Sequence, residues 1–310
     1  MSLPSYLLFM RPDESVVEVT SVVDGFQIQI RLTLETSVIT RDGIYKRGAS
    51  RATISLTRPE SLAPPPPIPS ERSAHVQYFD DRRSEFTKAA VKVMNRLIYF
   101  FKYQLHNPGL RDVNVSQDFG QPKWTDEHGN SVGHGSIEFT MSGIPGINGE
   151  PIAAELLSYT RDAELVAALA TDTSVDLASQ ILSDAQAALC EGHMRRAILE
   201  MAVACETATK ELFFPPNTAT HGLLEMLSNP PAVKDLIDKG CLNGLGESFK
   251  VKYPTHHENI DYLFRCRNKA VHLGQLWFID NHKNRVEPTT QTLSQWFVSC
   301  VTLLDWLHTL

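Results

Sequence analysis

The spacing of apolar residues changes along this chain, and the change divides it into two parts. Before about residue 141 the chain contains several runs in which apolar residues recur at every second position, whereas from about residue 151 only spacing of every third or fourth position is present. The first spacing fits a half-buried strand, and the second fits one face of a helix. The sequence therefore predicts an α+β domain over residues 1–150 and an all-α helical domain over residues 172–310, joined by a connecting helix over residues 151–171.

An antiparallel hairpin is predicted near the N-terminus. Val17 and Val19 alternate with polar residues before Asp24-Gly25, and a second alternating run begins at Phe26. Two such runs around Asp-Gly are a strong hairpin signal. A third alternating run covers residues 52–56. Because alternation implies one buried face, we expect an antiparallel sheet that is covered on one side.

A long helix is expected to cover that sheet. It is predicted from about Asp80 to Leu105, because Phe86, Val93 and Phe101 fall on one helix face. The segment beyond it contains four side chains of the kinds that ligate metals, namely Asp126, Glu127, His128 and His134. Their spacing matches no metal site, so we interpret the segment as a hairpin tip and expect no metal or cofactor.

Two long helices open the second part, and the short Glu191-Gly192-His193 link predicts that they pack as an antiparallel pair. Their apolar stripes are Ala178, Ile181, Leu182, Ala185 and Leu189 on the first, and Met194, Ile198, Met201, Cys205, Ala208 and Leu212 on the second. Glu206 lies beside the second stripe, where an acid is either solvated or paired with a cation from a facing helix. A closing helix is predicted from Thr289 to Leu310, with Leu293, Trp296, Phe297, Cys300, Leu304 and Leu307 facing inward.

The stretch from Leu263 to Gly274 places a guanidinium, an amide and an imidazole within six residues near the end of a predicted helix. Asn268 and His272 are an i, i+4 pair, so their side chains are neighbours. Arg267 lies about 140° around the helix axis from His272. The predicted buried face consists of Ile260, Leu263, Phe264, Arg267 and Val271. A buried guanidinium at Arg267 would need an acidic or phosphate partner.

Composition narrows the classes of function. The chain has 310 residues and a net charge of −7, so no overall positive field attracts nucleic acid, although a local cationic cleft remains compatible with this charge. Its five cysteines form no Cys-x-x-Cys pair, which is typical of free thiols in a reducing compartment. The first residues lack a signal peptide, and no apolar run approaches about 18 residues. We therefore expect a cytoplasmic protein without a membrane segment.

Taken together, these helices and their polar residues resemble the HEPN superfamily of helical domains. The resemblance rests on the helix pair, an acid on its second helix, the Arg-Asn-x-x-x-His motif near the end of a later helix and the closing helix, over about residues 171–310. It implies a metal-independent ribonuclease, of the kind found in toxin, abortive-infection and CRISPR-linked antiviral defence systems, with a composite site in a homodimer. Arg267, Asn268 and His272 would be catalytic, and Glu206 matches the upstream acid. An RNA substrate and an antitoxin or regulatory partner follow from the same resemblance.

The chemistry of these residues also suits RNA cleavage. An imidazole can transfer the protons, and a guanidinium fork can bind phosphate oxygens. Two other interpretations stay open at the level of sequence. In one, the helical domain is a non-catalytic HEPN-like module for dimerisation or nucleotide binding, with Arg267 paired structurally to Glu206. In the other, the chain is an unrelated two-domain adaptor in which the motif arises by chance.

Overall fold

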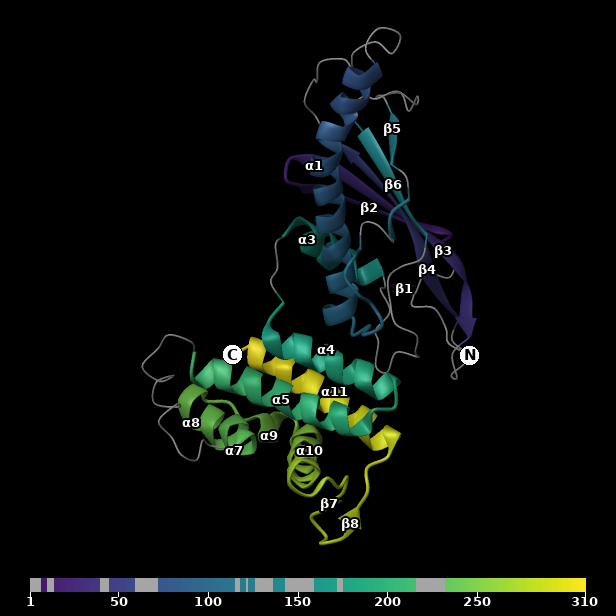
Figure 1. The fold of residues 1–310 in the computed structure, drawn as a ribbon. Coiled ribbons are helices and arrows are strands. Elements are labelled where there is room, and N and C mark those ends of the chain that lie inside the picture. Colours follow the sequence, from purple (N-terminus) through teal and green to yellow (C-terminus); the bar gives the residue numbers. More distant parts are fainter. Residues whose placement is uncertain are drawn as a thin grey trace. The chain divides into compact units, whose positions relative to one another are not determined.

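The computed structural model describes most of the chain (Figure 1). The described residues are 7–9, 14–39, 45–58, 72–114, 118–120, 122–125, 136–142, 159–171, 175–215 and 232–310. The chain folds into two compact units, which are residues 1–149 with 154–174, and residues 150–153 with 175–310. The first unit contains a sheet and a long helix, and in the described part of the second unit helices predominate. None of the described helices combines the length and apolar character that crossing a membrane requires.

The sheet of the first unit is antiparallel throughout its described pairings, as the alternating runs predict. Its strands are β1 (Leu7–Phe9), β2 (Val16–Val23), β3 (Phe26–Ile39), β4 (Tyr45–Thr57), β5 (Lys123–Thr125) and β6 (Ser136–Ser142). They follow the order β2-β3-β4-β6-β5, and β1 also pairs with β4. At the β2–β3 turn, Asp24 and Gly25 have φ angles of 50° and 82°. A two-residue hairpin turn of the primed type requires positive φ at both positions, so the predicted hairpin is confirmed.

Helix α1 (Arg72–Tyr99) covers the apolar face of the sheet, and a π-helical turn, Phe100–Gln104, extends it. The rings of Phe26 and Phe86 meet edge to face at 4.8 Å in this core. The long helix is thus confirmed, but it begins at Arg72 rather than near Asp80. Its first turns carry no apolar stripe, so hydrophobic spacing alone does not reveal them.

A second helix of the first unit, α3 (Asp162–Ala170), follows the short 3₁₀ turn Tyr159–Arg161. Leu165 and Leu169 are buried in the same core as the sheet, and Arg96 Nη1 donates to the Leu169 carbonyl oxygen at 2.6 Å. Of the predicted connecting helix at residues 151–171, the described residues 159–171 therefore pack within the first unit, and the rest lies outside the described residues. The predicted hairpin tip at residues 126–134 lies outside the described residues.

The second unit is built on four long helices: α4 (Leu177–Cys190), α5 (Met194–Phe213), α10 (Pro254–Leu273) and α11 (Thr290–His308). Shorter elements are α7 (Val233–Asp235), a π-helical turn (Leu236–Gly240), α8 (Cys241–Leu245), α9 (Phe249–Lys252), and the strands β7 (Phe278–Ile279) and β8 (Arg285–Val286). Gly192, with a φ of 80°, makes the tight α4–α5 turn. All six residues predicted to face inward on α11 are buried, and Ala178, Leu182, Ala185 and Leu189 of α4 are buried with them.

The predicted buried face of α10 is confirmed at Ile260 and Leu263 and wrong at Arg267 and Val271. The buried residues of α10 are Ile260, Leu263, Cys266 and Ala270. Phe264 is half-buried, Val271 is 52% exposed, and the side chain of Arg267 is 31% exposed. The buried stripe is therefore rotated toward Cys266 and Ala270, two small side chains among the inward-facing positions of α10, and Arg267 lies at its edge.

The cysteines of the chain are free, as their spacing predicts. Burial raises the pKa of the Cys241 and Cys266 thiols from 9.0 to about 11. Burial, and then a hydrogen bond with Cys205, raise the pKa of Cys300 well above 9.0. These thiols stay protonated at neutral pH, so they behave as small apolar side chains of the helical core and not as nucleophiles.

Candidate functional site

Helix α10 carries the motif and has well-defined ends. Pro254 occupies its first turn, where a missing N–H costs nothing. Gly274 ends it with a φ of 68°, in the left-handed conformation that glycine adopts without strain. Arg195 Nη2 at the start of α5 donates a hydrogen bond to the Gly274 carbonyl oxygen. The last turn of α10, which contains His272, is thereby tied to α5.

Arg267, Asn268 and Glu206 form one connected cluster. Arg267 Nη1 donates to Asn268 Oδ1 at 3.2 Å, and Arg267 Nη2 lies 3.9 Å from Glu206 Oε2. Glu206 Oε1 accepts a much shorter bond, of 2.6 Å, from Lys210 Nζ. Arg267 is thus oriented by its neighbour Asn268, while the charge of Glu206 is shared with a lysine one turn further along α5.

His272 lies beyond this cluster. It is exposed on the last turn of α10, and its imidazole forms no hydrogen bond or ion pair with the residues that the structure describes. Asn268 is its i, i+4 neighbour, and Arg267 lies about 7.5 Å lower along the helix axis. The helix backbone therefore holds the imidazole and the guanidinium on one rigid element, without any direct bond between them.

The structure adds two residues that the sequence reasoning missed. Lys210 binds Glu206 as an i, i+4 pair, and this charge spacing could have revealed it. Arg195 of α5 donates a hydrogen bond to Gly274 at the end of α10, 79 residues later in the sequence. No local pattern signals such a contact, because it depends on how α5 and α10 pack.

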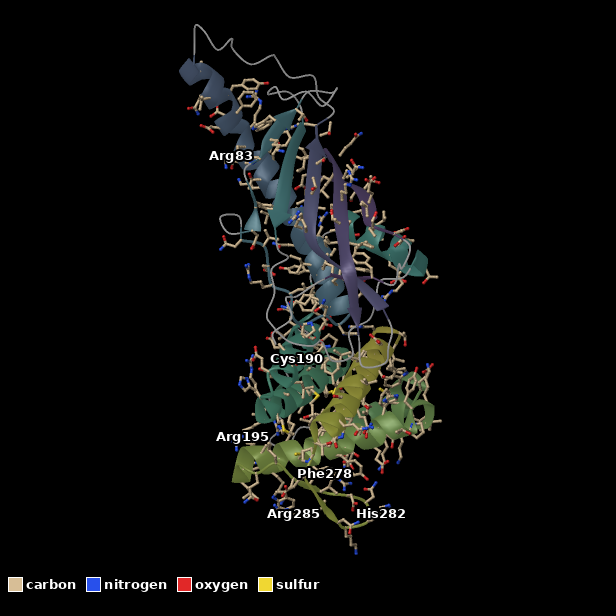
Figure 2. The ribbon with its side chains drawn as sticks, turned by 90° about the vertical axis from the view of Figure 1, so that its right-hand side faces the viewer. Arg83, Cys190, Arg195, Phe278, His282 and Arg285 are labelled. Carbon is tan, nitrogen blue, oxygen red and sulfur yellow. The ribbon has the colours of Figure 1, made fainter. Side chains whose placement is uncertain are left out.

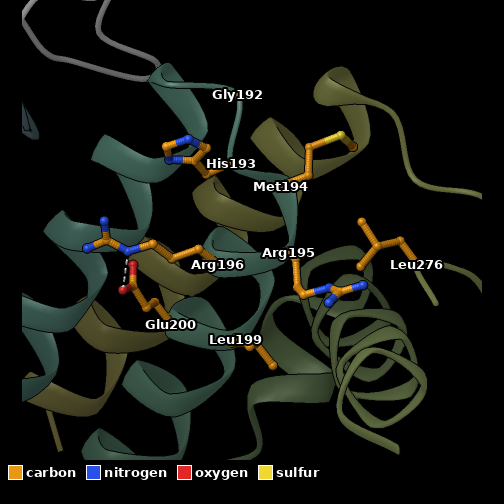
Figure 3. Close-up of a pocket in the computed structure, with 8 residues that line it drawn as sticks. All are labelled: Gly192, His193, Met194, Arg195, Arg196, Leu199, Glu200 and Leu276. Atoms are coloured by element: carbon orange, nitrogen blue, oxygen red, sulfur yellow. Dashed lines mark hydrogen bonds and ion pairs between the residues drawn. The ribbon is translucent and has the colours of Figure 1, made fainter. Parts of the chain in front are cut away.

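A hollow of about 810 Å³ opens beside the α4–α5 turn. Figure 3 shows Arg195 and Leu276 together on one side of it, with the Arg196–Glu200 ion pair on the other. Its lining residues are Gly192, His193, Met194, Arg195, Arg196, Leu199, Glu200 and Leu276. The four predicted site residues are not part of this lining, so the candidate site is a surface feature of α5 and α10 outside this hollow. Within the described ranges, no three His, Cys, Asp or Glu side chains converge as metal ligands do.

This arrangement can bind and polarise a phosphate group. A guanidinium has five N–H donors, and Arg267 uses one of them for Asn268. The contact with Glu206 does not use a second N–H donor of Arg267, because its length of 3.9 Å exceeds the range of a hydrogen bond. An exposed imidazole one to two turns away can exchange protons with a bound ligand or with water.

Comparisons of the chain with protein-family models, with curated proteins and with solved structures found no match.

Proposed function

We propose that the helical unit is HEPN-like and that the protein is a metal-independent endoribonuclease. The observation that carries the proposal is the state of Arg267, which Asn268 orients and Glu206 holds only at 3.9 Å, on the same helix as the exposed His272. Arg267 therefore retains donors for phosphate oxygens, and His272 is accessible to a large polyanion. The setting that fits such an activity is a cytoplasmic toxin or antiviral defence effector, restrained by an antitoxin or regulatory partner.

The proposed reaction uses the 2′-hydroxyl of RNA as its nucleophile. His272 accepts the 2′-hydroxyl proton while the 2′-oxygen forms a bond to phosphorus. The bond from phosphorus to the 5′-oxygen then breaks, and the leaving oxygen takes up a proton. Arg267 stabilises the added negative charge on the phosphate oxygens, and Asn268 keeps its guanidinium in place. The products are a 2′,3′-cyclic phosphate and a 5′-hydroxyl.

This reaction needs one proton acceptor and one proton donor, and each chain supplies one His272. We therefore propose a homodimer through the helical unit, in which a two-fold axis brings two copies of the motif to one substrate. Light scattering at micromolar concentration should give twice the chain mass. A monomeric mass in a sample with full cleavage activity would contradict the shared site.

Substitution of Arg267 tests the proposed role of the guanidinium. We expect both Arg267→Ala and Arg267→Lys to lose at least about 100-fold in cleavage rate, because a point charge does not replace a planar fork. The measurement is cleavage of labelled RNA in EDTA, with the product ends identified. Stability should fall by less than about 1 kcal/mol, since the Arg267 and Glu206 side chains are 31% and 30% exposed. A fully active Arg267→Lys would exclude a fork at the phosphate.

One observation favours a second candidate, a non-catalytic HEPN-like module for dimerisation or nucleotide binding. Glu206 contacts both Arg267 of α10 and Lys210 of α5 within one chain, at 3.9 Å and 2.6 Å. Contacts of this kind can have a purely structural role, which is to hold α5 against α10. In that case wild-type protein leaves RNA intact, while the Arg267 variants lose helix packing or nucleotide affinity instead.

A further inference from the structure

Two cations meet one aromatic ring where the β7–β8 hairpin approaches the last turns of α10. Lys269 Nζ lies 4.6 Å from the centroid of the Trp277 ring, and Arg285 Cζ lies 4.8 Å from it. Lys269 belongs to α10, one turn before His272, whereas Arg285 belongs to β8. We propose that Lys269, Trp277 and Arg285 bind single-stranded RNA next to the phosphate on which Arg267 and His272 act. This inference rests on the proposed ribonuclease function and gives it a substrate-binding surface.

The hairpin that carries Arg285 is anchored in the core of the helical unit. Phe278 of β7 is 4% exposed. Its ring packs edge to face on Trp296 at 5.5 Å and lies 4.9 Å from the ring of Tyr262. Figure 2 labels Phe278 beside the helices, with His282 and Arg285 further out on the hairpin. The cluster is therefore displayed at the surface from a rigid base.

Hydrogen bonds hold the β7–β8 hairpin in addition to the packing of Phe278. Arg265 of α10 donates to the Ile279 carbonyl oxygen at 2.9 Å and to Asn281 Oδ1 at 3.1 Å. At the tip, Asp280 Oδ1 accepts the backbone N–H groups of His282 at 2.9 Å and Asn284 at 2.7 Å. A surface that is held in one conformation before binding loses little entropy when a ligand arrives.

The charge around Trp277 is positive in a protein whose net charge is −7. Glu287 pairs with Arg285 at 2.9 Å, but it is 70% exposed, and a solvated pair of this kind is easily exchanged for a phosphate. Asp280 faces the hairpin's own backbone, and the N–H of Asn284 lowers its pKa. The exposed Lys283 extends the positive surface along the tip.

The position of Lys269 favours RNA over an acidic peptide. Lys269 and His272 are three residues apart on α10, so their side chains are neighbours on one helix face. A polyanion that contacts Lys269 therefore passes His272. Single-stranded nucleic acid is bound by cations that track its phosphates and by aromatic or guanidinium planes that meet its bases, and this cluster offers both.

Binding can be measured without turnover by using an RNA that cannot react. The probe is a fluorescein-labelled 2′-O-methyl oligouridine, which has no free 2′-hydroxyl, and its affinity for the full-length protein is read by fluorescence anisotropy over a range of salt. We expect Lys269→Gln/Arg285→Gln to weaken binding at least about tenfold. The negative slope of log affinity against log salt should become shallower by about 1.4, which corresponds to two lost phosphate contacts on a single strand. Trp277→Leu should weaken binding about tenfold with an unchanged slope.

The control removes the same charge elsewhere in the helical unit. Lys250 and Lys252 of α9 are exposed, and Lys252 also lies by an aromatic ring, 5.8 Å from the centroid of Tyr253. Lys250→Gln/Lys252→Gln should bind the probe as wild type does. Equal weakening by both double variants overturns the proposal, because it would reflect overall charge alone. Cluster-dependent binding of polyglutamate, without binding of the RNA probe, also overturns it.

Cleavable RNA separates this proposal from the proposed function. We expect Lys269→Gln/Arg285→Gln to raise KM about tenfold with kcat within about twofold of wild type, whereas Arg267→Ala lowers kcat. Cleavage with unchanged KM and unchanged probe affinity overturns the binding surface and leaves the ribonuclease assignment intact. Cluster-dependent probe binding by a wild type that cleaves no RNA upholds the surface and overturns the ribonuclease.

Discussion

His272→Ala should lower the rate of RNA cleavage in EDTA by about 10²–10⁴-fold, the usual contribution of a positioned proton-transfer group. His272 is exposed and makes no bond within the described residues, so its loss should change the free energy of unfolding by less than about 0.5 kcal/mol. The measurement is a single-turnover assay on end-labelled RNA, with thermal unfolding of the same samples. A lower cleavage rate with unchanged thermal unfolding would show that His272 acts in the reaction and does not support the fold.

The chain offers a matched control for that variant. His308 is also the basic residue in the last turn of a long helix, and its side chain is 58% exposed. It lies 3.9 Å from Asp176, away from the motif on α10. His308→Ala should cleave RNA at the wild-type rate. Cleavage that persists in His272→Ala, or that disappears from wild type when EDTA is added, would refute the assignment.

Trp296→Ala should destabilise the helical unit by about 3–5 kcal/mol. Trp296 is 1% exposed, and its ring supports both the α11 core and Phe278 of β7. Its removal leaves a cavity that the surrounding helices cannot fill without moving. Chemical denaturation, followed by hydrogen exchange along the chain, should show lost protection in α10, α11 and the β7–β8 hairpin. Because the hairpin carries Arg285, RNA affinity should fall together with this protection.

Val298→Ala is the control on the same helix. Val298 is 42% exposed, so its truncation should cost within about 0.5 kcal/mol. Equal destabilisation by both substitutions would mean that α11 is not packed through Trp296.

Some elements of the fold can be predicted from the sequence because neighbouring residues alone determine them. Asp24-Gly25 predicts its own turn, because few other residue pairs accept positive φ at both positions. Much of the inward face of α11 is also predictable, because the six apolar residues that share helical spacing are all buried, although Leu303 and Trp306 are buried beside them. The β7–β8 hairpin cannot be predicted in this way. Its strands are two residues each, too short for alternation to be visible.

The candidate site is predictable only in part. The motif residues can be assigned to the end of one helix, and Gly274 to the position after it, from spacing and composition alone. The rotation of α10 cannot be predicted, because it depends on small residues such as Cys266 and Ala270 fitting among neighbouring helices. That rotation moves Arg267 from the predicted buried face to its edge, where its side chain is 31% exposed.

The strand order of the first unit has a consequence for how the protein is made. Strands β2, β3 and β4 are consecutive neighbours, so they can pair as soon as they leave the ribosome. Strand β6 comes after α1, and Thr57 of β4 must wait for Ser136 before it finds its partner. During that interval residues 51–57 of β4 form an open edge, the feature through which nascent chains join to one another. Slow translation between β4 and β6 would therefore lengthen the period in which this protein is prone to aggregate.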